Sequence, residues 1–134
     1  VYLVQRNKSG RDLQVMAGVE EGLRKGNPVV MFVEGTRTRT GDLLPFKKGA
    51  FKAAANTGVP LIPVAISGTF QIAPPGKWPT RSHPVSLRFG EPYFVDPSLP
   101  ITQVQEEFRV ILIKLLSEDR GSAYNGRLND SESR

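Results

Sequence analysis

The sequence contains no cysteine, a single histidine and no long apolar run. The absence of cysteine excludes disulfide frameworks, thiolate nucleophiles and cysteine-based zinc sites. No stretch approaches the roughly 18 to 20 apolar residues needed to cross a bilayer, and no basic-then-apolar leader of the signal-peptide type is present. We therefore expect neither a membrane-spanning helix nor a leader within these 134 residues.

The residues that are present have the composition of one ordinary soluble globular domain, 39% hydrophobic and 23% charged. A chain of 134 residues can bury a core without disulfides or a structural metal. The formal net charge of +5 favours partners that carry phosphate: nucleic acid, an anionic membrane surface or a phosphorylated small substrate. Composition does not choose among these three.

Apolar spacing and glycine or proline breaks predict alternating strands and helices. Four apolar runs predict strands, at residues 1–4, 29–33, 61–66 and 85–89. Three segments predict helices: one from a capping box at Ser9 and Asp12 to a stop at Gly26, one over 48–57, and one from Thr102, with Gln105 in the reciprocal capping position. The glycine- and proline-rich residues 67–84 predict an excursion without regular structure.

This order predicts an α/β fold with a largely parallel sheet flanked by helices. Residues 29–33 are apolar throughout, which favours a strand covered on both faces, whereas Pro63 favours an edge or bulge position. The chain opens at Val1 on a run that predicts a strand already in progress, so we expect a fragment incomplete at its N-terminus. Residues 1–117 are expected to form the C-terminal part of a domain, and polar residues 118–134 a flexible tail.

Residues 34–48 are the most chemically loaded segment, and they follow the carboxyl end of the 29–33 strand, where ligands bind in parallel sheets. Arginine offers a planar fork of donors matched to phosphate oxygens, lysine adds a point charge, and Gly35 lets backbone N–H groups approach closely. The start of the next helix adds the positive end of its dipole. The segment therefore predicts a phosphate site, with the cations Arg37, Arg39, Lys47 and Lys48.

Glu34 is an acid inside this basic segment. Its simplest interpretation is a pair with an arginine, which would aim the remaining donors at a ligand. The alternative for the whole segment is a solvated surface loop without a ligand.

Three phrases then follow one another in order: Glu34-Gly35-Thr36-Arg37, Phe46-Lys47-Lys48-Gly49 and Ile62-Pro63-Val64. Together they resemble the phospholipid/glycerol acyltransferase family, typified by bacterial 1-acyl-sn-glycerol-3-phosphate acyltransferases. The resemblance runs from about Leu3 to Pro92 and covers the second, third and fourth of the family's four sequence blocks. The family's second block is a strand that ends in arginine, and it is matched here by residues 1–4 followed by Arg6. It implies that residues 1–117 are the C-terminal part of an acyltransferase domain.

The resemblance also implies roles for individual residues. Arg6 and Arg37 would grip the phosphate of the acceptor, Glu34 would organise the site and Lys47 would support it. The full substrate-phosphate site implied in this way comprises Arg6, Glu34, Gly35, Thr36, Arg37 and Lys47.

One block of the family pattern is missing, the histidine followed five residues later by aspartate. In the family that histidine is the general base that takes the proton of the acceptor hydroxyl, and the aspartate orients its ring. The only histidine here, His83, is followed five residues later by Arg88 and lies in a turn-like sequence, so we interpret it as an exposed loop residue. We expect no catalytic residue in this chain, with the base and its aspartate upstream of Val1.

The implied activity is transfer of an acyl chain from acyl-CoA or acyl-carrier protein to the free hydroxyl of a lysophospholipid, with lysophosphatidate as the expected acceptor. No cofactor is implied, and isolated acids such as Asp12 and Asp42 predict no metal site. Nucleic acid is disfavoured because the cations gather at one loop without interleaved aromatic residues. The lipid acceptor implies peripheral contact with the cytoplasmic face of a membrane. The rival hypothesis is a non-catalytic module that binds phospholipid head groups or another phosphate.

Overall fold

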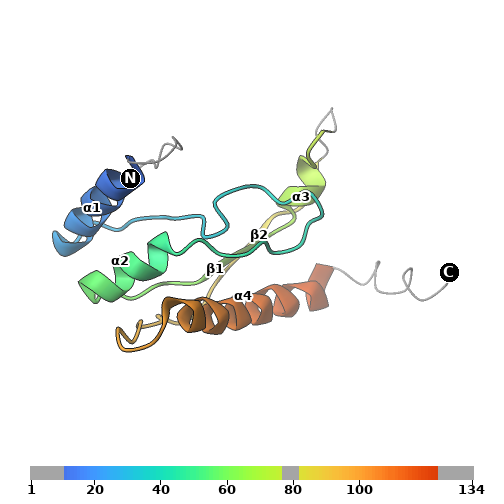
Figure 1. The fold of residues 1–134 in the computed structure, drawn as a ribbon. Coiled ribbons are helices and arrows are strands. Elements are labelled where there is room, and N and C mark those ends of the chain that lie inside the picture. Colours follow the sequence, from blue (N-terminus) through green and yellow to red (C-terminus); the bar gives the residue numbers. More distant parts are fainter. Residues whose placement is uncertain (1–10, 77–81, 124–134) are drawn as a thin grey trace. The chain divides into compact units, whose positions relative to one another are not determined.

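The computed structural model describes residues 11–76 and 82–123. The chain divides into two compact units rather than the single core that composition indicated: unit 1 is Val1–Leu61 with Pro92–Glu107, and unit 2 is Ile62–Glu91 with Phe108–Arg134. Figure 1 shows the described elements. In chain order they are α1 (Arg11–Arg24), α2 (Gly49–Thr57), β1 (Val64–Ser67), α3 (Thr69–Ile72), β2 (Ser86–Phe89) and α4 (Ile101–Ala123).

Helix α1 of unit 1 is the first helix that the apolar spacing predicted. It buries Val19, which is 1% exposed, on the side that faces α2. The helix ends where glycine allows a left-handed exit, because Gly26 has a φ of 80° and its N–H donates to the Leu23 carbonyl at 3.0 Å. The predicted capping residue Ser9 lies outside the described residues.

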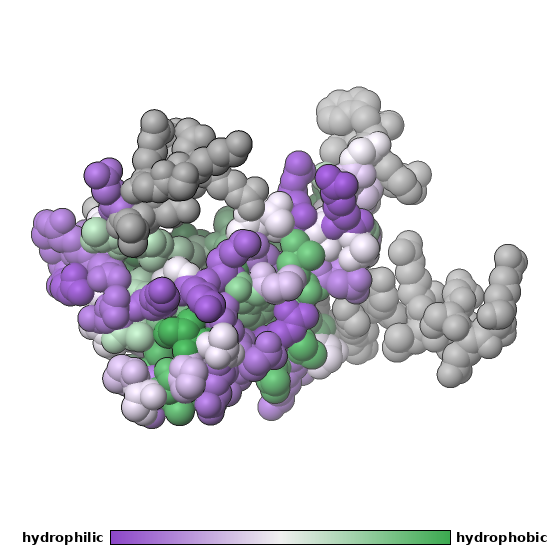
Figure 2. Space-filling view, in the orientation of Figure 1, coloured by the Kyte–Doolittle hydropathy of each residue, from purple (hydrophilic) through white to green (hydrophobic). Residues whose placement is uncertain are grey.

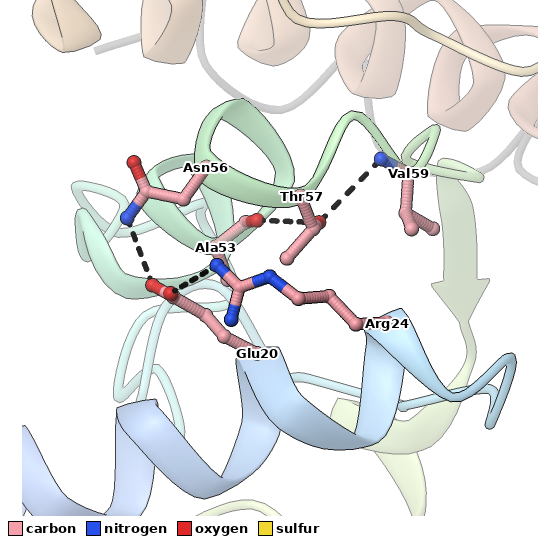
Figure 3. Close-up of polar contacts among 6 residues, drawn as sticks. All are labelled: Glu20, Arg24, Ala53, Asn56, Thr57 and Val59. Atoms are coloured by element: carbon pink, nitrogen blue, oxygen red, sulfur yellow. Dashed lines mark hydrogen bonds and ion pairs between the residues drawn. The ribbon is translucent and has the colours of Figure 1, made fainter.

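Helix α2 packs against α1 through small side chains and one large ring. Phe51 is 0% exposed, and the ring of Phe46 stacks on it with centroids 6.2 Å apart. A polar contact joins the same two helices: Asn56 Nδ2 donates to Glu20 Oε1 at 2.9 Å (Figure 3). Glu20 also accepts from Arg24 at 3.2 Å, so one carboxylate orders both helices.

The segment 29–33 differs from its prediction. Val30 and Phe32 are 74% and 77% exposed, while Val29, Met31 and Val33 are half-buried, which is the alternation of an extended segment with one free face. The segment joins no ladder formed by the described residues. A strand needs a hydrogen-bonded neighbour, and the predicted strand at residues 1–4 lies outside the described part of the chain. The prediction of a strand covered on both faces is therefore wrong for Val30 and Phe32.

Unit 2 contains the two-stranded sheet, in which β1 and β2 run antiparallel with Val64 opposite Phe89. The predicted strands 61–66 and 85–89 are confirmed in place, with shifted ends. The proline in the first of them, Pro63, precedes the strand, and its carbonyl accepts from the Gly90 N–H at 2.8 Å. The largely parallel sheet is not confirmed, because the chain returns after β1 in the opposite direction and β2 pairs with it antiparallel.

One face of this sheet is apolar and exposed. It carries Val64, Ile66, Leu87 and Phe89, which are 37%, 39%, 56% and 69% exposed. These residues share a face because they occupy alternate positions that pair across the ladder. Figure 2 shows that other parts of the visible surface also carry apolar patches, which lie between polar residues.

Helix α4 begins where the sequence predicted but runs further, through Ala123. Residues 118–123, assigned from sequence to a flexible tail, are therefore helical. The apolar stripe ends near Leu116, and the next two side chains make polar contacts: Ser117 Oγ donates to the Lys114 carbonyl at 2.7 Å, and Glu118 lies 3.9 Å from Arg88 of β2.

Candidate phosphate-binding site

The loop after residues 29–33 belongs to unit 1 and starts with a tight turn at Gly35. Its φ of 65° lies in the left-handed region, and its N–H donates to the Phe32 carbonyl at 2.9 Å. A side chain at this position would strain the backbone. The predicted role of Gly35, close approach of backbone N–H groups to a ligand, is a separate matter and stays a prediction.

Glu34 holds the loop through backbone rather than through an arginine. Its Oε2 accepts from the Leu44 N–H at 2.7 Å, and the contact is partly buried. Within residues 11–76 and 82–123 no ion pair joins Glu34 to an arginine. The predicted pair is therefore wrong for Arg37 and Arg39, because a loop that folds back over ten residues brings an N–H to the carboxylate first. Glu34 thus closes the loop through a backbone bond, and its role in organising a phosphate site stays a prediction.

A second bond closes the loop beside the first. The Lys47 N–H donates to the Val33 carbonyl at 2.7 Å, so the two ends of the basic segment lie together. The peptide group that carries this N–H is held on its other side as well, since Gln105 Nε2 of α4 donates to the Phe46 carbonyl at 2.6 Å.

The tip of the loop is ordered by hydroxyl groups. Thr38 Oγ1 accepts from the Gly41 N–H at 3.1 Å, and Thr40 Oγ1 donates to Asp42 Oδ2 at 2.8 Å. Gly41 has a φ of 94°, so the turn again uses the conformational freedom of glycine. Asp42 therefore stabilises the turn, and the described residues contain no group of three or more acids or histidines placed to hold a metal ion.

The cations of the site point to solvent. Arg37, Arg39, Lys47 and Lys48 are exposed, and the described part of the chain records no ion pair for any of them. Lys48 is also the N-cap of α2, has no side-chain capping bond, and is followed by a first turn without an acidic residue. Positive charge is thus concentrated at the N-terminus of α2 without an acidic partner from the described residues, an arrangement suited to an anion.

Two further predicted residues have different outcomes. Arg6 lies outside the described residues, so its position relative to Arg37 is not tested. Thr36 is exposed in the loop between Glu34 and Arg37.

His83 is the exposed loop residue that the sequence predicted. Its Nδ1 lies 2.8 Å from the carbonyl oxygen of the next residue, Pro84, and donates to it in the tautomer that protonates Nδ1. Arg88, five residues on, pairs with Glu118. Within residues 11–76 and 82–123, no carboxylate is bonded to the His83 ring as the orienting group of a catalytic imidazole would be.

Elsewhere in unit 1, the Tyr93 hydroxyl donates to Glu107 Oε2 at 2.6 Å. Burial, and then the bond to Glu107, raise the pKa of Tyr93 to about 12. The same bond, with a second from Gln103, lowers the pKa of Glu107. The pair ties the segment before α4 to the second turn of that helix.

The contact that Gln105 makes was not predicted from its position in the sequence. The expected capping box with Thr102 is not the bond that begins α4, because its first bonds run from the N–H groups of Gln103 and Val104 to the Pro100 carbonyl. The side chain of Gln105 reaches a segment 59 residues away instead. No local pattern could have indicated a partner so distant in sequence.

Comparison with known proteins places this geometry in a family. The sequence profile described as Acyltransferase matches residues 1–67, half of the chain, and those residues include the whole basic loop. The chain belongs to this family. Among residues 11–76 and 82–123, no helix is both long and apolar enough to cross a membrane.

Several curated proteins are similar to part of the chain. It is 49% identical over 63 residues to 1-acyl-sn-glycerol-3-phosphate acyltransferase BAT2, chloroplastic, of Brassica napus, a match that covers 47% of this chain and 18% of that protein. It is 46% identical over 68 residues to the 1-acyl-sn-glycerol-3-phosphate acyltransferase of Salmonella typhimurium, covering 50% of this chain and 28% of that protein. The matches thus span less than a third of the length of these relatives.

A solved structure is similar over a larger part. The crystal structure of the 1-acyl-sn-glycerophosphate (LPA) acyltransferase PlsC from Thermotoga maritima superposes with a TM-score of 0.73 at 29% identity, covering 82% of this chain and 46% of that chain. The predicted acyltransferase-like α/β fold class is confirmed by this likeness.

Proposed function

We propose that this chain is the part of a 1-acyl-sn-glycerol-3-phosphate acyltransferase that binds the phosphate of the acceptor. The observation that carries the proposal is the basic loop, which is closed at Glu34 and Lys47 and leaves Arg37 and Lys47 exposed. Family membership across residues 1–67 and the names of the similar proteins support it.

Each residue of the loop has a distinct part in binding. Arg37 supplies two parallel N–H donors to phosphate oxygens, and Lys47 supplies a point charge. Gly35 keeps the turn free of a side chain, so that backbone N–H groups near Thr36 can approach the ligand. Arg6 is proposed as a second guanidinium on the same phosphate. Glu34 orients the loop through Leu44 and does not touch the ligand.

The chemistry proposed for the whole enzyme is transfer of an acyl group from a thioester of coenzyme A or acyl-carrier protein to the free hydroxyl of lysophosphatidate. The hydroxyl oxygen attacks the thioester carbonyl, the thiolate leaves, and the hydroxyl proton passes to a general base. No residue of this chain fits that base, since His83 bonds to backbone and faces no described carboxylate. We propose that a histidine outside these 134 residues supplies it. No cofactor enters this reaction.

The lipid acceptor places the whole enzyme at a membrane. A monoacyl phospholipid partitions into bilayers, and the excess of positive charge favours an anionic surface such as the cytoplasmic leaflet. We propose peripheral contact on that side, and no nucleic-acid partner.

A chimera tests the proposal. The 68-residue segment of the Salmonella typhimurium enzyme that matches this chain is replaced by the corresponding residues of this chain, and thiol release from acyl-CoA with lysophosphatidate is measured. We expect activity within about tenfold of the parent enzyme, and loss of acceptor use on Arg37→Ala. The isolated chain should bind glycerol 3-phosphate without turnover. A folded chimera that lacks activity would contradict the proposal.

The rival, a phosphate-binding module without catalysis, is favoured by one observation, that the single histidine of the chain is bound to backbone. It predicts that the isolated chain binds glycerol 3-phosphate while the folded chimera is inactive. Turnover by the isolated chain would contradict both hypotheses, and His83→Ala would then be the first variant to examine.

A further inference from the structure

The peptide group between Phe46 and Lys47 is held at both of its polar atoms. Its carbonyl oxygen accepts from Gln105 Nε2 at 2.6 Å, and its N–H donates to the Val33 carbonyl at 2.7 Å. Because a peptide group is planar and rigid, bonds at its two polar ends restrain its position and the direction of its C=O and N–H groups. They thereby restrain the Cα of Lys47, from which its side chain departs.

The two bonds also strengthen each other. A carbonyl that accepts a hydrogen bond polarises the N–H of the same peptide group, which then donates more strongly. The Val33 carbonyl that accepts from this N–H belongs to the residue directly before Glu34. A series of hydrogen bonds therefore connects α4, through the Phe46–Lys47 peptide, to the residue that closes the basic loop. All of these residues belong to unit 1.

The side chain at position 105 must be a donor of the right length. Gln105 is half-buried, and its contact with Phe46 is partly buried, so water competes less for the carbonyl than it does at the surface. Phe46 is anchored on its other side by the stack of its ring on Phe51. A glutamate of the same shape would place acceptor oxygens against the carbonyl and would break the link.

We propose that Gln105 is a positioning residue for the acceptor phosphate: it orients the Phe46–Lys47 peptide and so presents Lys47 at the basic loop. The inference rests on the proposed function, because it assigns Gln105 to the same phosphate site. It adds a residue from α4, far outside the residues 1–67 that match the family profile.

The test uses the full 134-residue chain with glycerol 3-phosphate as the probe. Gln105→Met keeps the length and removes the donor, and Gln105→Glu keeps the shape and opposes the carbonyl. Gln103→Met is the matched control, since Gln103 is exposed on the same helix and donates at 3.0 Å to Glu107 only at the surface. NMR titration gives the Kd, and amide hydrogen exchange reports each N–H.

We expect Gln105→Met to raise the Kd about three- to tenfold, as for the loss of one hydrogen bond, and Gln105→Glu to raise it further. Exchange at the Lys47 N–H should speed up while the amides of α1 stay unchanged. Gln103→Met should leave both values as in the wild type. A merely structural role would instead speed exchange throughout unit 1 and leave the Kd of the folded fraction unchanged.

The outcomes separate this inference from the proposed function. If the wild-type chain binds glycerol 3-phosphate and both Gln105 variants bind it equally well, the inference is overturned and the phosphate site stands. If the wild-type chain does not bind the probe, the proposed site falls, and the role of Gln105 falls with it.

Discussion

The carboxylate of Glu34 accepts a hydrogen bond of 2.7 Å from the backbone N–H of Leu44, ten residues further along the chain. The residue that follows the 29–33 segment therefore fixes the far side of the loop that carries Arg37. The acidic side chain of Glu34 therefore stabilises the conformation of the cationic loop and leaves the guanidinium groups of the loop available to a ligand.

Replacing Glu34 should loosen this loop. Glu34→Ala leaves the partly buried Leu44 N–H without its acceptor, so we expect a loss of about 1–2 kcal/mol in the free energy of unfolding in urea. Exchange at the Leu44 N–H should speed up, and the Kd for glycerol 3-phosphate should rise. Asp42→Ala is the control, because its exposed carboxylate bonds only near the loop tip. Equal effects of the two variants would refute the loop-closing role.

The Tyr93–Glu107 pair should make stability depend on pH at both extremes. The pKa of Tyr93 is raised from 10.0 to about 12, so its contribution is full below pH 10 and is lost as the pH rises to about 12. The pKa of Glu107 is lowered from 4.5, so its contribution is present above pH 4.5 and is lost as the pH falls through the lowered value.

Tyr93→Phe removes the shared proton and tests both signs at once. The free energy of unfolding, measured from about pH 3 to about pH 12, should change less with pH in the variant than in the wild type at both the acidic and the alkaline end. NMR titration should show the pKa of Glu107 returning towards its ordinary value. A Glu107 titration that is the same in both proteins would show that the bond is absent in solution.

The contact between α1 and α2 should couple Glu20 with Asn56. Single substitutions also change helix propensity, so a double-mutant cycle with Glu20→Ala and Asn56→Ala isolates the bond. We expect a coupling of about 0.5–1 kcal/mol, because Glu20 is only 19% exposed and joins two elements (Figure 3). The cycle for Glu21 and Lys25, which are 66% and 65% exposed, should give a smaller value. The reverse order would contradict this account of the interface.

Helices α1, α2 and α4 and the two paired strands could be predicted because their signals are local, whereas the four-residue α3 lies in residues 67–84, for which no regular structure was predicted. The spacing of apolar residues along α1 and the stops at Gly26 and Gly58 lie within a few residues of the structures that they determine. The direction of the sheet could not be predicted in the same way. Pairing is a property of distant segments, and an apolar run such as residues 29–33 does not reveal its neighbour or which face stays exposed.

The candidate site shows the same division. The types and order of its residues indicated a phosphate site, because cations and glycine at a helix start have a chemical reason to occur together. The partner of Glu34 could not be predicted, since a backbone N–H is offered by nearly every residue and only the folded loop selects Leu44. Gln105 was missed for a related reason: its acceptor, the Phe46 carbonyl, becomes its neighbour only after α4 has packed.

The central claim is that Arg37 binds the phosphate of the acceptor, and a comparison of Arg37→Ala with Arg39→Ala tests it most directly. Both residues are exposed in the same loop, and each substitution removes one positive charge, so general electrostatic attraction falls equally. We expect Arg37→Ala to raise the Kd for glycerol 3-phosphate roughly ten- to hundredfold, as for a lost charged hydrogen bond, and Arg37→Lys to recover part of that. Arg39→Ala should change it less than about threefold. Equal Kd values for the two alanine variants would contradict the assignment and return the loop to a solvated basic surface.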